Sequence, residues 1–300
     1  MKSIKYFLFL VYLVCFVPLT AQNIISGKVF LDKNGNGIQD RSEHGIKAVP
    51  VSNGRDVVLT DKDGNFSISV ADGESLFPII PSGYTSSSGD IIRSSDFLFK
   101  TRQSKDKVDF ALKKEKQPEH FTLGAIGDIQ MGNPQELDYA NQTIIPELAG
   151  RKDIQLAVWL GDLVNNRLEL FEDVREMIRC TEIPSWVLPG NHDRITNGHT
   201  LQDSLFNCYF GASAYAFNYG NVHFIILNNV APDSKRGYKA RISDRQMTFI
   251  KNDLSYVPKD RFVVFCQHIP LVHTENIEDL KTLLNGRNKL FALSGHTHRV

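Results

Sequence analysis

Five short polar segments carry side chains that bind divalent cations. Their Asp, Asn, Gln and His residues offer oxygen or imidazole nitrogen to hard and borderline metal ions. The segments are Gly127-Asp128-Ile129-Gln130, Gly161-Asp162-Leu163, Gly190-Asn191-His192-Asp193, Gln267-His268 and Gly295-His296-Thr297-His298. Paired metal ions hydrolyse phosphate esters by activating water and neutralising charge on the phosphoryl oxygens. The set therefore predicts a hydrolytic centre with two metal ions.

Each polar segment follows an apolar, β-prone stretch, so the ligands are expected at the ends of strands. The stretches are Phe121–Ile126, Leu156–Leu160, Ser185–Leu188, Arg261–Cys266 and Lys289–Leu293. Open α/β sheets bind their ligands in the crevice at the carboxyl ends of the strands. We therefore expect the five segments to converge on one crevice.

The order of elements after residue 120 predicts an α/β sandwich. Helices are expected over Pro134–Leu148, Asn166–Arg179, Asp244–Ser255 and Asn276–Leu284, with apolar residues on one face. A hairpin is expected where Gly220-Asn221 joins Tyr215–Tyr219 to Val222–Leu227. Helices alternating with strands are typical of layered α/β folds.

A different pattern precedes residue 113. Residues 23–112 contain short β-prone pieces separated by turn-rich segments and no helical period of useful length, as in a small all-β sandwich. Residues 113–119 are mostly charged and include Pro118, which is typical of a linker. The expected chain is therefore a small β-sandwich domain, a linker and an α/β domain over residues 120–300.

The order of the five segments resembles the calcineurin-like metallophosphoesterase superfamily over residues 121–300. This resemblance implies two divalent transition metal ions (Mn, Fe or Zn) that share the carboxylate of Asp162. It implies that one ion is completed by Asp128, Gln130 and His298, and the other by Asn191, His268 and His296. Gln130 departs from the commoner pattern, which has His there; an amide oxygen can still ligate, but it is neutral and harder than imidazole.

The resemblance also implies a catalytic acid. His192 would protonate the leaving oxygen, with Asp193 holding its imidazole. Arg194, which follows, is expected to be a solvated surface residue. Taken one at a time, several of these residues could instead have a purely structural role. Gly190-Asn191, for example, could be an ordinary turn.

The function predicted is hydrolysis of a phosphodiester or phosphomonoester of unidentified structure. Two alternatives stay open. The same centre could serve a pyrophosphatase or nucleotidase, or the fold could be a non-catalytic binding module at the cell surface.

A second metal site is predicted near the start of the chain. Residues 32–43 match a twelve-residue calcium loop, with Gly37 at its sharp turn. The expected ligands are Asp32, Asn34, Asn36, Ile38 (through its carbonyl), Asp40 and Glu43. The segment resembles the calcium-stapled loops of B-type repeats in bacterial surface adhesins, which implies a structural calcium ion; a polar hairpin loop without an ion is the alternative.

The amino terminus has the features of a signal peptide. Lys2 and Lys5 precede an apolar run from Tyr6 to Val17, and small residues lead to Ala21. The run is shorter than the roughly 18–20 residues that span a membrane. We therefore expect residues 1–21 to be cleaved off and the protein to be exported to the periplasm, cell surface or medium. No transmembrane segment is expected in the mature chain.

Charge argues against an obligate nucleic-acid partner. The full chain has 34 basic and 34 acidic side chains, and removal of residues 1–21 takes away only two lysines. Such a near-neutral chain has no general electrostatic attraction for polyanions.

Overall fold

The computed structural model describes residues 23–99, 106–196 and 202–298. The expected signal peptide, residues 1–21, lies outside the described residues. Within those ranges, none of the helices combines the length and apolar character needed to cross a bilayer.

The α/β region contains two sheets, and the five ligand-bearing strands are divided between them. One sheet has the order β11-β10-β9, with all pairs parallel. The other has the order β12-β13-β16-β17, in which β12 is antiparallel to β13 and the other pairs are parallel. The strands are β9 (Thr122–Ile126), β10 (Ile154–Trp159), β11 (Ser185–Val187), β12 (Tyr215–Tyr219), β13 (Val222–Leu227), β16 (Phe262–Gln267) and β17 (Leu290–Ser294).

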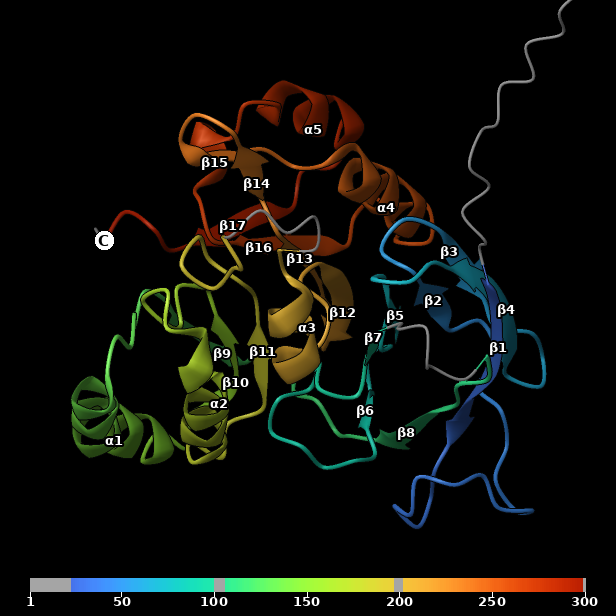
Figure 1. Ribbon diagram of the computed structural model, residues 1–300. Helices are drawn as coiled ribbons and strands as arrows, with labels where there is room; N and C mark the ends of the chain where they lie inside the picture. Colours follow the sequence, from blue (N-terminus) through green and yellow to red (C-terminus); the bar gives the residue numbers. More distant parts are fainter. Residues whose placement is uncertain (1–22, 100–105, 197–201, 299–300) are drawn as a thin grey trace, which may run out of the picture.

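Helices lie on both outer sides of these sheets, which gives the predicted α/β sandwich (Figure 1). Helices α1 and α2 lie beside the β9–β11 sheet, whereas α4 and α5 lie on the far side of the β12–β17 sheet. The helical segments are α1 (Pro134–Ala149), η1 (Leu168–Leu170), α2 (Phe171–Arg179), α3 (Ser204–Phe210), α4 (Asp244–Leu254), η2 (Leu271–His273) and α5 (Ile277–Leu283).

Local sequence signals explain where these helices begin. Asn133 caps α1 by accepting a hydrogen bond from the Glu136 N–H, and Pro134 occupies the first helical turn. Ser243 caps α4 in the same way. The helix expected from Asn166 begins later, because Asn166 adopts a positive φ of 57° that no α-helix can contain.

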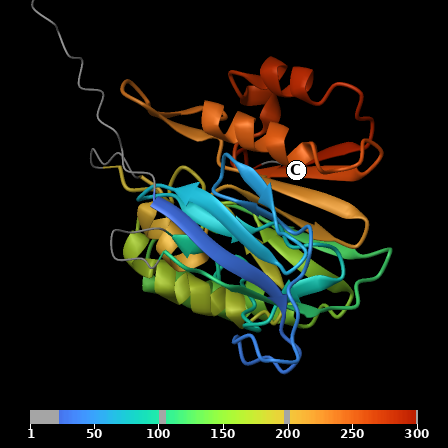
Figure 2. The same cartoon turned by 90° about the vertical axis from the view of Figure 1, so that its right-hand side faces the viewer.

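Residues before 115 form two four-stranded sheets, as expected of an all-β region (Figure 2). Their orders are β4-β1-β8-β6 and β3-β2-β5-β7. In β4, buried and more exposed residues alternate, because only one face of that strand packs on the core. The strands are β1 (Asn23–Leu31), β2 (Pro50–Ser52), β3 (Val57–Leu59), β4 (Asn65–Val70), β5 (Ser75–Pro78), β6 (Tyr84–Ser86), β7 (Leu98–Phe99) and β8 (Phe110–Lys114).

The two regions share one hydrophobic core. Phe77 and Phe97 from the first region contact Tyr215 from the second at ring-centroid distances of 6.3 and 5.4 Å. Two ion pairs reinforce this contact, Arg179–Asp90 at 2.6 Å and Arg245–Glu74 at 2.7 Å. The all-β region is therefore packed firmly on the α/β region.

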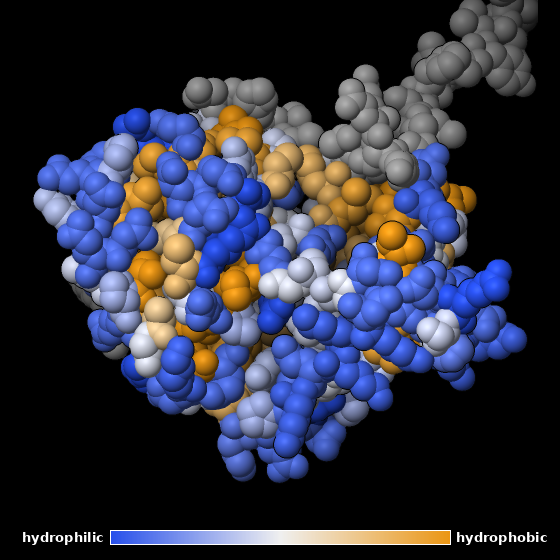
Figure 3. Space-filling model, turned by 90° about the horizontal axis from the view of Figure 1, so that it is seen from below, coloured by the Kyte–Doolittle hydropathy of each residue, from blue (hydrophilic) through white to orange (hydrophobic). Residues whose placement is uncertain are grey.

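The segment expected to be a linker takes part in this packing. Strand β8 continues to Lys114, and the side-chain oxygen of Gln117 accepts hydrogen bonds from the N–H groups of Gly83 and Gly220, each at 2.9 Å. Residues 113–119 thus join the two regions as an ordered connection. The face of the molecule shown in Figure 3 is mostly hydrophilic, with hydrophobic side chains in smaller patches.

Candidate metal centre

The centre of the site is formed by Asp162 and His268, which are buried, and His296, which is half-buried. One ligand atom from each of the three lies within 4.8 Å of the others. The Nε2 atom of His268 is 3.1 Å from Nδ1 of His296 and 3.1 Å from Oδ1 of Asn191. These four residues follow β10, β11, β16 and β17, so the carboxyl ends of strands from both sheets meet here.

The remaining predicted ligands border this group. Nε2 of His298 is 3.4 Å from Oδ1 of Asp128, whose carboxylate accepts the backbone N–H of His296 at 2.9–3.0 Å. The amide nitrogen of Gln130 donates to Oδ2 of Asp162 at 2.9 Å. In this orientation Gln130 supports the shared carboxylate, and a half-turn of its amide would present the oxygen to a cation. The fold thus brings all seven predicted ligands together.

The chemistry of the central donor set fits a divalent cation. His268 Nδ1 lies 2.9 Å from the Leu160 carbonyl, and donation of its hydrogen there leaves the Nε2 lone pair facing the group. Asn191 Oδ1 and Asp162 Oδ1 also present lone pairs, the latter 3.4 Å from His268 Nε2. A cation can satisfy several such lone pairs at once.

Unusual backbone conformations are concentrated at these ligands. In the described part of the chain, eight non-glycine residues have positive φ. Five of the eight are predicted ligands, namely Asp128 (58°), Gln130 (45°), Asp162 (51°), His296 (71°) and His298 (51°). Each such conformation costs about 1–3 kcal/mol and persists where the surrounding structure imposes it, most often at functional sites. The sharp turns also explain how His296 and His298 can serve one centre despite their spacing.

Two glycines allow the polypeptide segments to approach each other closely. A Cβ atom at Gly190 would lie 2.1 Å from Oδ1 of Asp162 and 2.3 Å from its backbone nitrogen. A Cβ atom at Gly295 would lie 2.4 Å from Oδ2 of Asp128. Neither contact is sterically possible, so these positions require glycine.

Electrostatics keep Asp162 ionised. Burial raises its pKa, but the hydrogen bond and charge of His268 in its protonated form, the His192 N–H and the Gln130 amide together lower the pKa to about 2. An ionised carboxylate at the centre of the group is what a pair of cations would share. The pKa of His296 is lowered by burial and by the neighbouring His268, which favours the neutral, ligating imidazole.

The structure gives Asp193 a role different from the one expected. Its carboxylate accepts backbone N–H groups of Leu163, Val164 and Gly190 at 2.8–3.1 Å. Nδ1 of His192, which Asp193 was expected to hold, is buried without a partner in the described chain. Asp193 therefore pins two ligand segments together, and burial raises its pKa to about 6.

His192 itself is well placed to act on a bound substrate. Its Nε2 lies 3.9 Å from Oδ2 of Asp162, and its side chain is 31% exposed. The ring can therefore reach both the metal centre and solvent.

A hairpin that the sequence did not predict forms a wall of the site. It consists of β14 (Val230–Asp233) and β15 (Gly237–Ala240). The Tyr238 ring packs edge-on against His296, with 6.1 Å between centroids and an interplanar angle of 85°. Arg194 was expected on the surface but is only 3% exposed, and its guanidinium donates to the carbonyl oxygens of Val230 and Gly237 at 2.8 and 3.5 Å. The apolar-polar alternation of β14 is too short to signal a strand.

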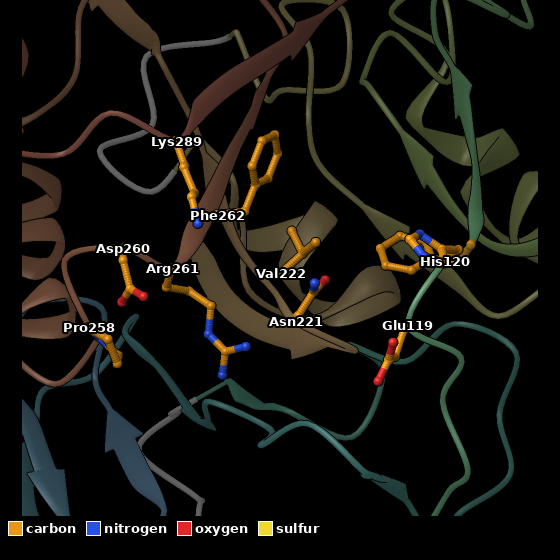
Figure 4. A pocket seen from close by; sticks show the side chains of 10 residues that line it. Glu119, His120, Asn221, Val222, Pro258, Asp260, Arg261, Phe262 and Lys289 are labelled. Carbon is orange, nitrogen blue, oxygen red and sulfur yellow. The ribbon is translucent and has the colours of Figure 1, made fainter.

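A large cavity lies away from this centre. It measures about 750 Å³ and lies where β13, β16 and β17 begin, at the opposite end of those strands from the predicted ligands. Phe262, Lys289, Arg261 and His120 line it (Figure 4).

The predicted calcium loop has its two end carboxylates buried. Asp32 accepts the N–H groups of Gly35 and Gly37 at 2.7 and 2.8 Å, and Glu43 accepts that of Lys33 at 2.7 Å. Asp40 is more exposed and accepts hydrogen bonds from the side-chain amides of Asn34 and Asn36, and Asn36 in turn accepts the N–H of Ile38.

Two family models match the chain. Residues 33–115 match the N-terminal region of calcineurin-like phosphoesterases. Residues 121–300 match the calcineurin-like phosphoesterase domain itself.

Two curated proteins are distant relatives. A 3′,5′-cyclic-nucleotide phosphodiesterase of Nostoc sp. (strain PCC 7120) is 26% identical over 161 residues, which cover 50% of this chain and 58% of the relative. A probable glycerophosphodiester phosphodiesterase of Arcobacter nitrofigilis is 24% identical over 165 residues, which cover 48% and 57%. The match thus spans little more than half of each relative. The converging ligands and the domain match over residues 121–300 place this chain among the calcineurin-like metallophosphoesterases.

Proposed function

We propose that this protein hydrolyses phosphodiester bonds at a centre of two divalent transition metal ions. The convergence of Asp162, Asn191, His268 and His296, of which only His296 is not buried, carries this proposal. Both curated relatives are named as phosphodiesterases, which supports a diester rather than a monoester or pyrophosphate.

The side chains divide between the two ions through Asp162. Asp128, Gln130 and His298 would hold one ion with it, and Asn191, His268 and His296 would hold the other. When bound, such a pair activates a water molecule and neutralises phosphoryl charge. His192 would donate a proton from Nε2 to the leaving oxygen, because this atom lies 3.9 Å from the shared carboxylate of Asp162 and its side chain is 31% exposed.

Comparing substrates on the purified protein tests this proposal. The protein, loaded separately with Mn²⁺, Zn²⁺ or Fe²⁺, is assayed with bis(p-nitrophenyl) phosphate, p-nitrophenyl phosphate and pyrophosphate. We expect the diester to have the highest kcat/KM. A preference for pyrophosphate would replace the proposal with a pyrophosphatase, and metal binding without any turnover would indicate a binding module.

We also propose that residues 32–43 hold a structural calcium ion, as the adhesin-like resemblance of this loop implies. The buried carboxylates of Asp32 and Glu43 and the nearby oxygens of Asn34, Asn36 and Asp40 support this proposal. Calcium would draw these oxygens together and brace the all-β region.

Export to the periplasm, cell surface or medium is a further proposal. It depends on the charged start and apolar run of residues 1–21. Finding the mature amino terminus near Gln22 in protein recovered outside the cytoplasm would support it, and an intact amino terminus on cytoplasmic protein would contradict it.

A further inference from the structure

The geometry points to Tyr238 as the residue that contacts an ester arm of the substrate, held in place by Arg194. This inference deepens the proposed function, since it concerns the same metal centre. The ester arm is the substituent of the phosphodiester that the metal ligands do not touch. Tyr238 would favour an arm that carries an aromatic or similarly flat group.

Tyr238, in strand β15 of the hairpin, lies next to the predicted metal ligand His296. Its ring lies edge-on against His296, and His296 packs in turn against His268 at 4.9 Å between ring centroids. Tyr238 is half-buried. A phosphoryl group bound beside His296 would bring one ester arm within reach of this ring.

The hairpin that carries Tyr238 is fixed at its base. The Arg241 N–H donates to the Asn229 carbonyl at 2.9 Å, and the Glu275 N–H donates to the Ala240 carbonyl at 2.8 Å. An ion pair of 3.0 Å joins Lys239 to Glu275. These contacts tie the hairpin to the segment that follows His268, so Tyr238 keeps its place relative to that ligand.

Arg194 secures the rest of the hairpin from within the protein. Its guanidinium donates to Val230 in β14 and to Gly237 in β15, the residue directly before Tyr238. These two carbonyls accept hydrogen bonds from its guanidinium, and the charge of Asp203 also acts on it. Arg194 directly follows Asp193, and it therefore couples the position of the ligand segment to that of Tyr238. We assign it as a positioning residue.

The hairpin tip suits an anionic substrate. Lys235 and Arg236 are exposed there, and their backbone N–H groups donate to Asp233 at 2.8 and 2.9 Å. A diester carries one negative charge, which these side chains would attract as it approaches. The Tyr238 ring, on the same hairpin as these basic side chains, is well suited to a flat ester arm, because aromatic pairs gain affinity from edge and stacking contacts.

Binding calorimetry with unreactive diesters tests this inference without relying on turnover. The Mn²⁺-loaded wild type, Tyr238→Ala and the control Tyr256→Ala are titrated with diphenyl phosphate and dimethyl phosphate. Tyr256 is 48% exposed and lies beyond α4, away from the ligands. We expect Tyr238→Ala to weaken diphenyl phosphate binding about tenfold. Its affinity for dimethyl phosphate and the amount of bound metal should be unchanged. The control should match the wild type.

Three results would overturn the inference. They are an unchanged affinity of Tyr238→Ala for diphenyl phosphate, an equal weakening of both esters, and a wild type that does not prefer diphenyl phosphate. Because no turnover is needed, a protein that hydrolyses no diester could still show this preference, and the two proposals can fail separately.

Arg194→Gln tests the positioning role. We expect it to weaken diphenyl phosphate binding in the same direction as Tyr238→Ala and to add little in the double variant. With the hydrolysable diester bis(p-nitrophenyl) phosphate, it should raise KM more than it lowers kcat. Additive effects in the double variant, with the fold intact by thermal melting, would show that Arg194 does not act through Tyr238.

Discussion

Replacing Gly190 with alanine should damage the metal centre, whereas the same change at Gly127 should not. Both glycines belong to the predicted ligand segments, yet the structure separates them. A Cβ atom at Gly190 would meet Asp162 Oδ1 at 2.1 Å, and its φ is not positive, so the cost is steric. At Gly127 the nearest atoms, in Leu160 and Gly295, are 3.4 and 3.5 Å away, which is ordinary contact.

The expected magnitude follows from the displacement required. Relieving the clash to 3.4 Å moves the shared carboxylate of Asp162 by about 1.3 Å. A misplacement of about 1 Å in a catalytic centre can cost about 100-fold in rate, which corresponds to about 2.7 kcal/mol. Overpacking at this buried position should also lower the free energy of unfolding by about 1–3 kcal/mol.

The assay compares kcat/KM for bis(p-nitrophenyl) phosphate and bound metal in the wild type, Gly190→Ala and Gly127→Ala. We expect about a 100-fold loss with weakened metal binding for Gly190→Ala, and activity within about threefold of wild type for Gly127→Ala. Equal losses in both variants, or a fully active Gly190→Ala protein, would refute the reasoning.

Three further predictions concern single side chains. Asp162→Asn should abolish turnover and metal binding, whereas His192→Asn should lower kcat about 100-fold and keep the metal; equal metal loss in both, measured by elemental analysis, would refute the assigned roles. Asp90→Asn should lower the free energy of unfolding by about 1–2 kcal/mol, because it removes the charge that pairs with Arg179. Burial raises the pKa of Asp90, but the hydrogen bond and charge of Arg179, with hydrogen bonds from the Ile92 N–H and the Ser95 hydroxyl, lower it below its ordinary value. This stabilisation is therefore present above about pH 4 and lost as the pH falls below it, so urea melts of the two proteins should converge at low pH. Calcium at 100 times its dissociation constant should stabilise the wild type by about 2.7 kcal/mol and Glu43→Gln much less; identical thermal shifts would contradict the calcium site.

Much of the α/β region could be predicted because its signals are local. Tyr215–Tyr219 and Val222–Leu227 form strands with the predicted bounds, since an Asn-containing turn joins two strongly apolar runs. The helix over Asp244–Leu254 begins after its predicted cap, Ser243. The ligand set could be identified because each member is a metal-binding type at the end of a strand.

Other features depend on contacts between distant residues. The short strand β14 and the burial of Arg194 arise from packing against the ligand segments, which the sequence pattern does not reveal. Helix α3 was also missed, because it is short and spans only Ser204–Phe210. Asp193 satisfies three backbone N–H groups, a role that only the folded geometry shows.

Metal reconstitution tests the central claim most directly. Metal-free protein is titrated with Mn²⁺ while bound metal and turnover of bis(p-nitrophenyl) phosphate are measured on the same samples. The account predicts about two ions bound per chain, turnover that rises with their binding, and neither property in Asp162→Asn. Turnover that persists without metal, or two bound ions in Asp162→Asn, would contradict it.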